Sequence, residues 1–251
     1  MEHKTDTDAV LPLIMSVGAH EASEVASKWP DLLKNMVVVS IRPARLNRCM
    51  ERLGPLGEFV RQVVGVDGNK LDIEAMLKSG KLEYINQWNT LTPGEVGCFL
   101  AHRKAWQFVV DNNWDFGFIL EDDVDLRPSY QTLGAIQEAK IEEQKFDILF
   151  IARDPKFCRI LTKIPVPNPH LVWAGKTWGL QAYVVSREAA SKLLAKTEKI
   201  IGYAVDLFVS CSSCVPRRLA ITPIPFHCVQ EGSDTQPSKD IVPSVSPSLT
   251  F

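Results

Sequence analysis

Short apolar runs alternate with longer amphipathic segments along most of this chain. The runs at 36–41, 59–66, 114–120, 146–151 and 179–185 have the length and the β-branched or aromatic content of buried strands. Apolar residues at three- and four-residue spacing predict helices over 44–53, 71–79, 94–112, 129–144 and 187–196, and leave 205–211 undecided. Strands that alternate with helices predict one α/β domain, whose mostly parallel sheet is covered on both faces.

The ends of the chain differ in composition from the part between them. Residues 1–35 are mixed and polar, so we expect an N-terminal extension before a domain over 36–231. Residues 232–251 are rich in Ser, Pro and Asp, which is typical of a flexible tail. Four prolines between 154 and 169 predict a long loop over the site.

Three consecutive carboxylates, Glu121, Asp122 and Asp123, follow the apolar run at 118–120. Ligands bind beyond the carboxyl ends of parallel strands, so residues 40–42, 66–68 and 121–123 should surround one crevice. Adjacent like charges repel, and a divalent cation is the simplest group that would make their proximity favourable. Mg²⁺ and Mn²⁺ take carboxylate oxygens together with substrate phosphates, which favours nucleotide-diphosphate chemistry. The alternative is a solvated acidic junction between strand and loop.

The helix at 94–112 begins with a capping box. Thr92 is in the N-cap position, Pro93 in the first helical position, and Glu95 three residues after the cap, which gives Glu95 a structural role. One stripe of this helix contains Glu95, Phe99, His102, Trp106 and Val109. A buried imidazole needs a partner. His102 is therefore either a satisfied core histidine or a residue that supports or lines the site.

Charge and composition exclude some classes of partner. With 28 basic and 30 acidic residues the net charge is -2, so we expect no nucleic-acid partner. Nothing near Met1 resembles a signal peptide, and residues 11–17 are interrupted by Pro12, so we expect a cytoplasmic protein, at most peripheral at a membrane.

Six cysteines are too sparse for a disulfide scaffold, and we expect buried free thiols. Cys211 and Cys214, with His227-Cys228, form only a partial zinc pattern. Trp173 and Trp178 suit either stacking on sugar rings at the mouth of the site or packing in the core.

Several ordered motifs together resemble glycosyltransferase family 25, which includes lipooligosaccharide and collagen galactosyltransferases. The first is Leu-Thr-Pro-Gly-Glu-Val-Gly-Cys at 91–98 with His102, and the second is Ile-Leu-Glu-Asp-Asp-Val at 119–124. The segments 38–45, 66–68, 179–186, the one around Asp206, and Gln230 with Ser233-Asp234 agree in order. Ala101 and Ser40 depart from the Ser and Asn that the family usually has there.

The resemblance implies a GT-A type fold, which is Rossmann-like, and a metal-dependent transfer with inversion. The expected donor is UDP-galactose or UDP-glucose, the cofactor Mn²⁺ or Mg²⁺, and the acceptor a glycan, a lipid-linked saccharide or a hydroxylated protein. The implied metal ligands are Glu121, Asp123 and His227, and the alternative for His227 is a surface imidazole. The implied nucleotide-sugar contacts are Ser40, Ile41, Arg42, Arg45, Asp67, Gly68, Gly97, His102, Asp122 and Gln181. Strand alternation would put Glu121 and Asp123 on one side and Asp122 on the other.

An inverting transfer needs a group that takes the proton of the acceptor hydroxyl. Asp206 matches the family's isolated acid, and its apolar neighbours suit a base; the alternative is a helix-capping Asp. Glu95 is the second candidate base. Asp125 is expected to be a solvated acid or an outer-shell residue.

Two further functions compete with the transferase. The first is a catalytically silent relative that binds a glycan or a protein surface. The second is a nucleotidyltransferase, which would need a Gly-rich phosphate loop after the first strand. Residues 42–45 read Arg-Pro-Ala-Arg instead, which disfavours a nucleotidyltransferase.

Overall fold

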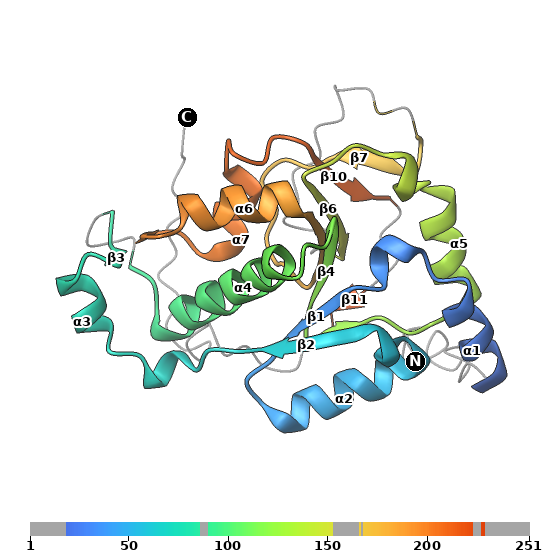
Figure 1. Ribbon diagram of the computed structural model, residues 1–251, viewed down its shortest axis with the longest axis horizontal. Coiled ribbons are helices and arrows are strands. Elements are labelled where there is room, and N and C mark those ends of the chain that lie inside the picture. Colours follow the sequence, from blue (N-terminus) through green and yellow to red (C-terminus); the bar gives the residue numbers. More distant parts are fainter. Residues whose placement is uncertain (1–18, 86–89, 153–165, 167, 223–226, 229–251) are drawn as a thin grey trace, which may run out of the picture.

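The computed structural model describes residues 19–85, 90–152, 166, 168–222 and 227–228. Within these ranges, the central sheet has seven strands in the spatial order β2-β1-β4-β8-β6-β10-β7 (Figure 1). In that order their bounds are Val60–Val64, Met36–Val39, Phe116–Glu121, Ala182–Ser186, Ile148–Ala152, Arg218–Ile221 and Leu171–Trp173. Two small sheets pair β3 (Leu82–Glu83) with β9 (Ile200–Ile201), and β5 (Val124–Asp125) with β11 (His227–Cys228).

The sheet is mostly parallel, as predicted. β2, β1 and β4 run in one direction, and β6 and β10 share it because both β4 and β6 are antiparallel to β8. β7 is also antiparallel. The reversal of β8 has a consequence for the site. It brings the amino end of β8 to the edge where the parallel strands have their carboxyl ends, so Gly179 and Gln181, which precede β8, join that edge.

Helices cover both faces of the sheet. The α-helices are α1 (Ala19–Ser27), α2 (Pro43–Leu53), α3 (Ile73–Lys78), α4 (Pro93–Asp111), α5 (Tyr130–Glu138), α6 (Arg187–Lys196) and α7 (Val205–Cys211). Short 3₁₀ turns are η1 (Asp31–Leu33), η2 (Gly54–Phe59), η3 (Gly68–Lys70) and η4 (Ile141–Glu143). Figure 1 shows α4, α6 and α7 on one side of the sheet and α1 and α5 on the other. One apolar cluster fills each side, so this is one mixed α/β domain compatible with the GT-A type.

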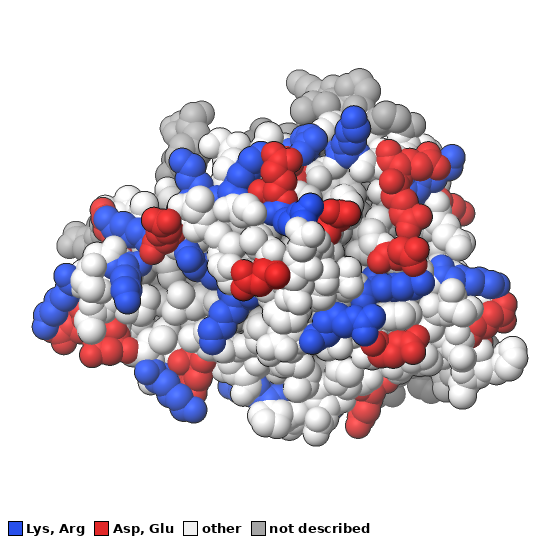
Figure 2. All heavy atoms as spheres, viewed as in Figure 1, with Lys and Arg blue, Asp and Glu red and all other residues white. Residues whose placement is uncertain are grey.

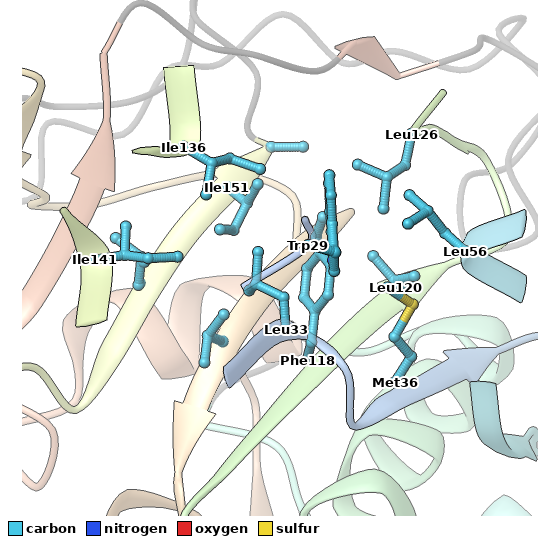
Figure 3. Close-up of a cluster of buried hydrophobic side chains, with 14 of the residues drawn as sticks. Trp29, Leu33, Met36, Leu56, Phe118, Leu120, Leu126, Ile136, Ile141 and Ile151 are labelled. Carbon is cyan, nitrogen blue, oxygen red and sulfur yellow. The ribbon is translucent and has the colours of Figure 1, made fainter. Parts of the chain in front are cut away.

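The organised structure begins earlier than expected. Trp29 and Leu33 are buried in the cluster beside Phe118 and Leu120 (Figure 3), and α1 packs ahead of them. The expectation of an extension up to residue 35 is therefore wrong for residues 19–35. Most apolar residues of this segment are small or isolated, so no strong period is visible in the sequence. Their burial comes from a sheet that is built by later residues.

Most other boundaries agree with the predictions within a few residues, and 205–211 is the helix α7. The predicted helix 129–144 ends at Glu138, and Lys140 adopts a left-handed conformation (φ 45°) before η4. The tail at 232–251 and most of the loop at 154–169 lie outside the described residues.

The described helices include none that is long and apolar enough to cross a membrane. Basic and acidic side chains are interspersed over the face shown in Figure 2, in agreement with the small net charge. No single sign of charge dominates the part of that face that the structure describes.

The start of α4 packs directly against the turn after β2. A Cβ on Gly97 would lie 2.6 Å from the Val66 carbonyl oxygen and 2.7 Å from the Gly68 nitrogen. A Cβ on Gly68 would overlap the Pro93 carbonyl oxygen. Gly97 and Gly68, which the resemblance implied as ligand contacts, therefore allow two backbones to approach each other.

We expect Gly97→Ala to lower the free energy of unfolding by about 1–3 kcal/mol, because backbone atoms cannot yield to the added methyl group. The matched control is Gly134→Ala in α5, where a Cβ meets no atom within 4 Å. Alanine is favoured over glycine in a helix by up to about 1 kcal/mol, so this variant should be as stable as the wild type or more stable. Denaturant titration measures both variants, and equal stability of the two would contradict the packing explanation.

Candidate active site

The three segments expected to meet do so at the carboxyl edge of the sheet. Val39 is in register with both Val64 and Glu121, which places the segments after β1, β2 and β4 side by side. The Asp122 amide donates to the Val39 carbonyl at 3.2 Å, and the Glu121 amide donates to the Gln181 carbonyl at 2.8 Å. This edge therefore gathers residues that are far apart in the sequence.

Asp122 is held by protein donors on both oxygens. The Ser40 hydroxyl donates to Oδ2 at 2.6 Å, and the Arg45 guanidinium lies 2.5 Å from Oδ1. Asp122 and Arg45 are both buried, and Arg52 donates to the Asp122 carbonyl at 2.7 Å. A buried carboxylate needs this compensation. These contacts of Asp122, Ser40 and Arg45 tie α2 and β1 to the end of β4, and the direct ligand contacts that the resemblance implied for the three residues stay a prediction.

The expected alternation of the three carboxylates does not hold. β4 ends at Glu121, and Asp122 and Asp123 form the turn before β5. As a result Asp123 approaches the same Arg45 guanidinium as Asp122, at 3.7 Å, whereas Glu121 faces His102. Side chains alternate between the two faces only within a strand, and β4 ends at Glu121, before Asp122 and Asp123.

His102 lies behind Glu121. Its Nε2 is 3.1 Å from Glu121 Oε1, and its Nδ1 is 2.9 Å from the Tyr183 hydroxyl oxygen. His102 is fully buried (0% exposed), so contact with a ligand falls to Glu121, whose side chain is 24% exposed. The structure shows a satisfied core histidine, and the role of His102 in supporting the site stays a prediction.

Glu95 completes the capping box. Its Oε2 accepts from the Thr92 amide at 2.7 Å, and its own amide donates to the Thr92 hydroxyl at 3.1 Å. One carboxylate oxygen is therefore committed to the helix start. This geometry favours the structural role of Glu95 over its role as a base.

Asp206 lies in the first turn of α7. Its Oδ2 accepts from the Gly179 amide at 2.8 Å, and its Oδ1 accepts from the Leu207 amide at 2.7 Å. Burial raises the pKa of Asp206 above its ordinary value, and the nearby Glu121 charge adds to this, whereas the two amides act in the opposite direction. A carboxylate that is oriented by two amides and has a raised proton affinity has the properties of a base.

The segment before β8 contributes a residue that sequence reasoning missed. Gly179 orients Asp206 and has φ +82°, a left-handed conformation that favours glycine. In the sequence, the feature that could have identified Gly179 is its position directly before an apolar run. Gln181, an expected ligand contact, has a buried side-chain oxygen (Oε1) that no described residue hydrogen-bonds. A buried acceptor of this kind is suited to a bound ligand.

The remaining expected residues follow the carboxyl ends of β1, β2 and β4 or pair with β5. Ile41 and Arg42 are exposed at the start of α2. Asp67 accepts from the Asn69 amide at 3.1 Å within its own turn. Asp125 is partly exposed and pairs with Arg127 at 2.9 Å. The backbone of residue 227 pairs with Asp125, which brings β11 beside the acidic turn, although the side chain of His227 lies outside the described residues.

The two tryptophans differ in exposure, and so do the two cysteines of the partial zinc pattern. Trp173 is half-buried against the core, whereas Trp178 is exposed beside Gly179, and the Lys176 ammonium lies 5.6 Å from the centre of its ring. Cys211 is exposed and Cys214 half-buried, and both are free, so the expectation of buried thiols is wrong for Cys211.

Two sets of side chains in the described part could hold a metal ion. Glu121 and Asp123, on either side of Asp122 in the sequence, have side chains that are 24% and 23% exposed, and carboxylates fit Mn²⁺ or Mg²⁺. Atoms of Cys98, His102 and Glu121 lie within 4.8 Å of one another and would suit a softer ion. Both nitrogens of His102 already have protein partners, so the carboxylate pair fits better. Burial and the charges of Glu121, Asp206, Asp123 and Glu95 raise the pKa of the Cys98 thiol well above its ordinary range, which indicates a negative potential that favours a cation.

Comparisons with known proteins identify the family to which this chain is similar. Residues 34–209 match the sequence model of a protein family described as "Glycosyltransferase family 25 (LPS biosynthesis protein)". Probable inactive glycosyltransferase 25 family member 3 of Bos taurus is 31% identical over 170 residues, which cover 64% of this chain and 28% of that protein. Procollagen galactosyltransferase 2 of Homo sapiens is 29% identical over 189 residues, which cover 68% of this chain and 29% of that protein.

The matched segment spans less than a third of the length of these relatives. Among solved structures, mannose-1-phosphate geranyltransferase from Thermus thermophilus aligns over 74% of this chain and 72% of that chain, with 11% identity and a TM-score of 0.38. The family description covers most of the chain, including both motifs and Asp206. The chain belongs to glycosyltransferase family 25.

Proposed function

We propose that this chain is an inverting, metal-dependent glycosyltransferase. It moves galactose or glucose from a UDP-sugar to a hydroxyl group of a glycan or protein acceptor. The observation that carries the proposal is the grouping of partly exposed Glu121 and Asp123 with the buried, amide-oriented Asp206 in a chain of family 25. Binding of a diphosphate and removal of a proton are the two demands of this chemistry.

Glu121 and Asp123 would hold the Mn²⁺ or Mg²⁺ ion. Such a cation, when bound, offsets the negative charge of the departing diphosphate. Side chains of the protein contact Glu121 and Asp123 and orient their carboxylates. His102 holds Glu121 at 3.1 Å, and Arg45 lies 3.7 Å from Asp123 while it neutralises the neighbouring Asp122. Asp122 therefore serves the site by orienting the turn that carries Asp123.

Asp206 is the proposed base. It would take the proton of the acceptor hydroxyl as the oxygen attacks the anomeric carbon and the UDP leaves. The Gly179 and Leu207 amides keep the carboxylate in one orientation, and burial raises its pKa, so it holds the proton better than an exposed aspartate does.

A saccharide acceptor is supported by the exposed Trp178. It precedes Gly179, the residue that orients Asp206, and an indole ring stacks on the apolar face of a sugar. The name of the human relative favours galactose as the transferred sugar and a procollagen-like protein as one acceptor class. Lipid-linked saccharides are the other class proposed for this chain.

A catalytically silent binding module is the second candidate. Relatives named as inactive are as similar to this chain as those named as galactosyltransferases. Such a module would bind a glycan or protein surface without turnover. The position of the Glu121 and Asp123 carboxylates at the end of β4 favours the enzyme.

A panel of UDP-sugars, incubated with the full chain and either Mn²⁺ or a chelator, tests the proposal. We expect one UDP-hexose to release UDP with Mn²⁺ and to raise the melting temperature, and chelator to abolish the release. Release of UDP that is equal in chelator would contradict the metal assignment. If no UDP-sugar shifts the melting temperature or is turned over, the silent module replaces the enzyme.

A further inference from the structure

A continuous series of buried hydrogen bonds leads from the core to Glu121. The Trp106 indole nitrogen lies 2.9 Å from the Tyr183 hydroxyl, this hydroxyl lies 2.9 Å from His102 Nδ1, and His102 Nε2 lies 3.1 Å from Glu121 Oε1. Trp106, Tyr183 and His102 are each 0% exposed. Apolar groups of the same shape would fill this space without any need for partners. Packing alone therefore does not explain why four polar groups are linked here.

The donors and acceptors in this series have one consistent direction. An indole N–H only donates, so the Tyr183 oxygen accepts from Trp106. The Tyr183 O–H then needs an acceptor, and His102 Nδ1 is the one that the described residues provide. Burial raises the pKa of Tyr183 well above its ordinary range, which keeps the hydroxyl protonated. The hydrogen bonds therefore assign the ring proton of His102 to Nε2, from which it points at Glu121 Oε1.

Three structural elements hold this series in place. His102 and Trp106 are one turn apart on α4, Tyr183 is the second residue of β8, and Glu121 ends β4. Tyr183 is in register with Ile119, so Glu121 projects from the face of the sheet that α4 covers. A shift of any one element would change the donor that reaches Glu121.

We propose that Trp106, Tyr183 and His102 are positioning residues, which hold Glu121 by Oε1 and leave its Oε2 for the divalent cation. This inference rests on the proposed function. Within the described residues, no donor reaches Oε2. A carboxylate that is already oriented loses little freedom when it binds, so the series raises the affinity of the site for the cation.

Tyr183→Phe tests the proposal, because it removes one oxygen and keeps the buried ring. Without the Tyr183 hydroxyl, His102 loses the donor that selects its Nε2–H form. We expect the dissociation constant for Mn²⁺ with UDP, measured by the loss of the free Mn²⁺ resonance signal, to rise about tenfold or more. The kcat at saturating Mn²⁺ should change much less. Nitrogen NMR of the metal-free protein should show the Nε2–H form in the wild type and a mixture in the variant.

Two further variants make the test specific. Trp106→Phe removes the indole donor to Tyr183 and should weaken Mn²⁺ binding in the same direction. Tyr84→Phe is the matched control, since its hydroxyl donates at 3.4 Å to the Leu91 carbonyl, outside the series. It should leave both the His102 spectrum and the Mn²⁺ affinity unchanged.

The outcomes separate this inference from the proposed function. Lower melting temperatures with unchanged Mn²⁺ affinity in Tyr183→Phe and Trp106→Phe would overturn the positioning role, although Mn²⁺-dependent sugar transfer by the wild type would still stand. A wild type that binds no Mn²⁺ with UDP would overturn the proposed function and the positioning role together, before any variant is made.

Discussion

Asp123→Ala should lower the kcat/KM for Mn²⁺-dependent UDP-sugar turnover by roughly a thousandfold, because a cation ligand contributes several kcal/mol to the stabilisation of the leaving diphosphate. Asp123 lies in the turn after β4, is partly exposed, and lies 3.7 Å from the Arg45 guanidinium, a longer distance than the 2.5 Å between Arg45 and Asp122. Its loss removes charge from the site without unpairing Asp122, which keeps its contacts with Ser40 and Arg45. Initial rates of UDP release over a Mn²⁺ series measure the effect.

Asp125→Ala is the matched control for this variant. Asp125 is two residues further on and forms an exposed ion pair with Arg127, a type of pair that contributes about 1 kcal/mol or less. Its turnover and melting temperature should remain close to those of the wild type. If Asp123→Ala retains the wild-type rate at every Mn²⁺ concentration, then Asp123 is not a metal ligand.

Asp206→Asn should lower kcat by about 10²- to 10⁴-fold and leave the KM for the donor nearly unchanged, because an amide cannot take the acceptor proton. The wild type should also lose activity at low pH, since protonated Asp206 cannot act as a base. Its raised pKa means that this loss begins at a higher pH than it would for an ordinary aspartate. Measurement of kcat for sugar transfer as a function of pH checks both statements.

Glu95→Gln discriminates between the two candidate bases. Glutamine keeps the acceptor that Glu95 provides in the capping box, so helix α4 should start in the same way. If Asp206 is the base, Glu95→Gln retains activity and Asp206→Asn does not. The opposite result would assign the base to Glu95 and leave Asp206 as an anchor for the Gly179 amide.

The strand and helix pattern was predictable because each element has its own period. The helix over Gly94–Asn112 and the helix over Arg187–Lys196 agree with α4 and α6 almost to the residue, since their caps are encoded locally. Trp29 and Leu33 were missed, because the surface that buries them belongs to strands that follow them in the chain. The reversed direction of β8 was missed as well, since a strand's apolar pattern does not record its direction.

The candidate site was predictable in part. The acidic run at 121–123, the capping box and Asp206 all stood out as residue types in a local context. The different hydrogen-bond partners of the carboxylates could not be predicted from the sequence. Asp122 is committed to Ser40 and Arg45, whereas Glu121 is committed to His102, and these partners come from separate elements.

By itself, the sequence determined that this is an α/β chain with an acidic turn after a buried strand, and it carried the motifs of family 25. These properties depend on neighbours within a few residues, where periodicity and capping operate. Only the tertiary structure decided that Tyr183 and Trp106 support Glu121 through His102, and that Gly179 orients Asp206. Those contacts join α4 to β8 and the segment before β8 to α7, and they exist only after long-range packing has placed each hydrogen-bond donor opposite its acceptor.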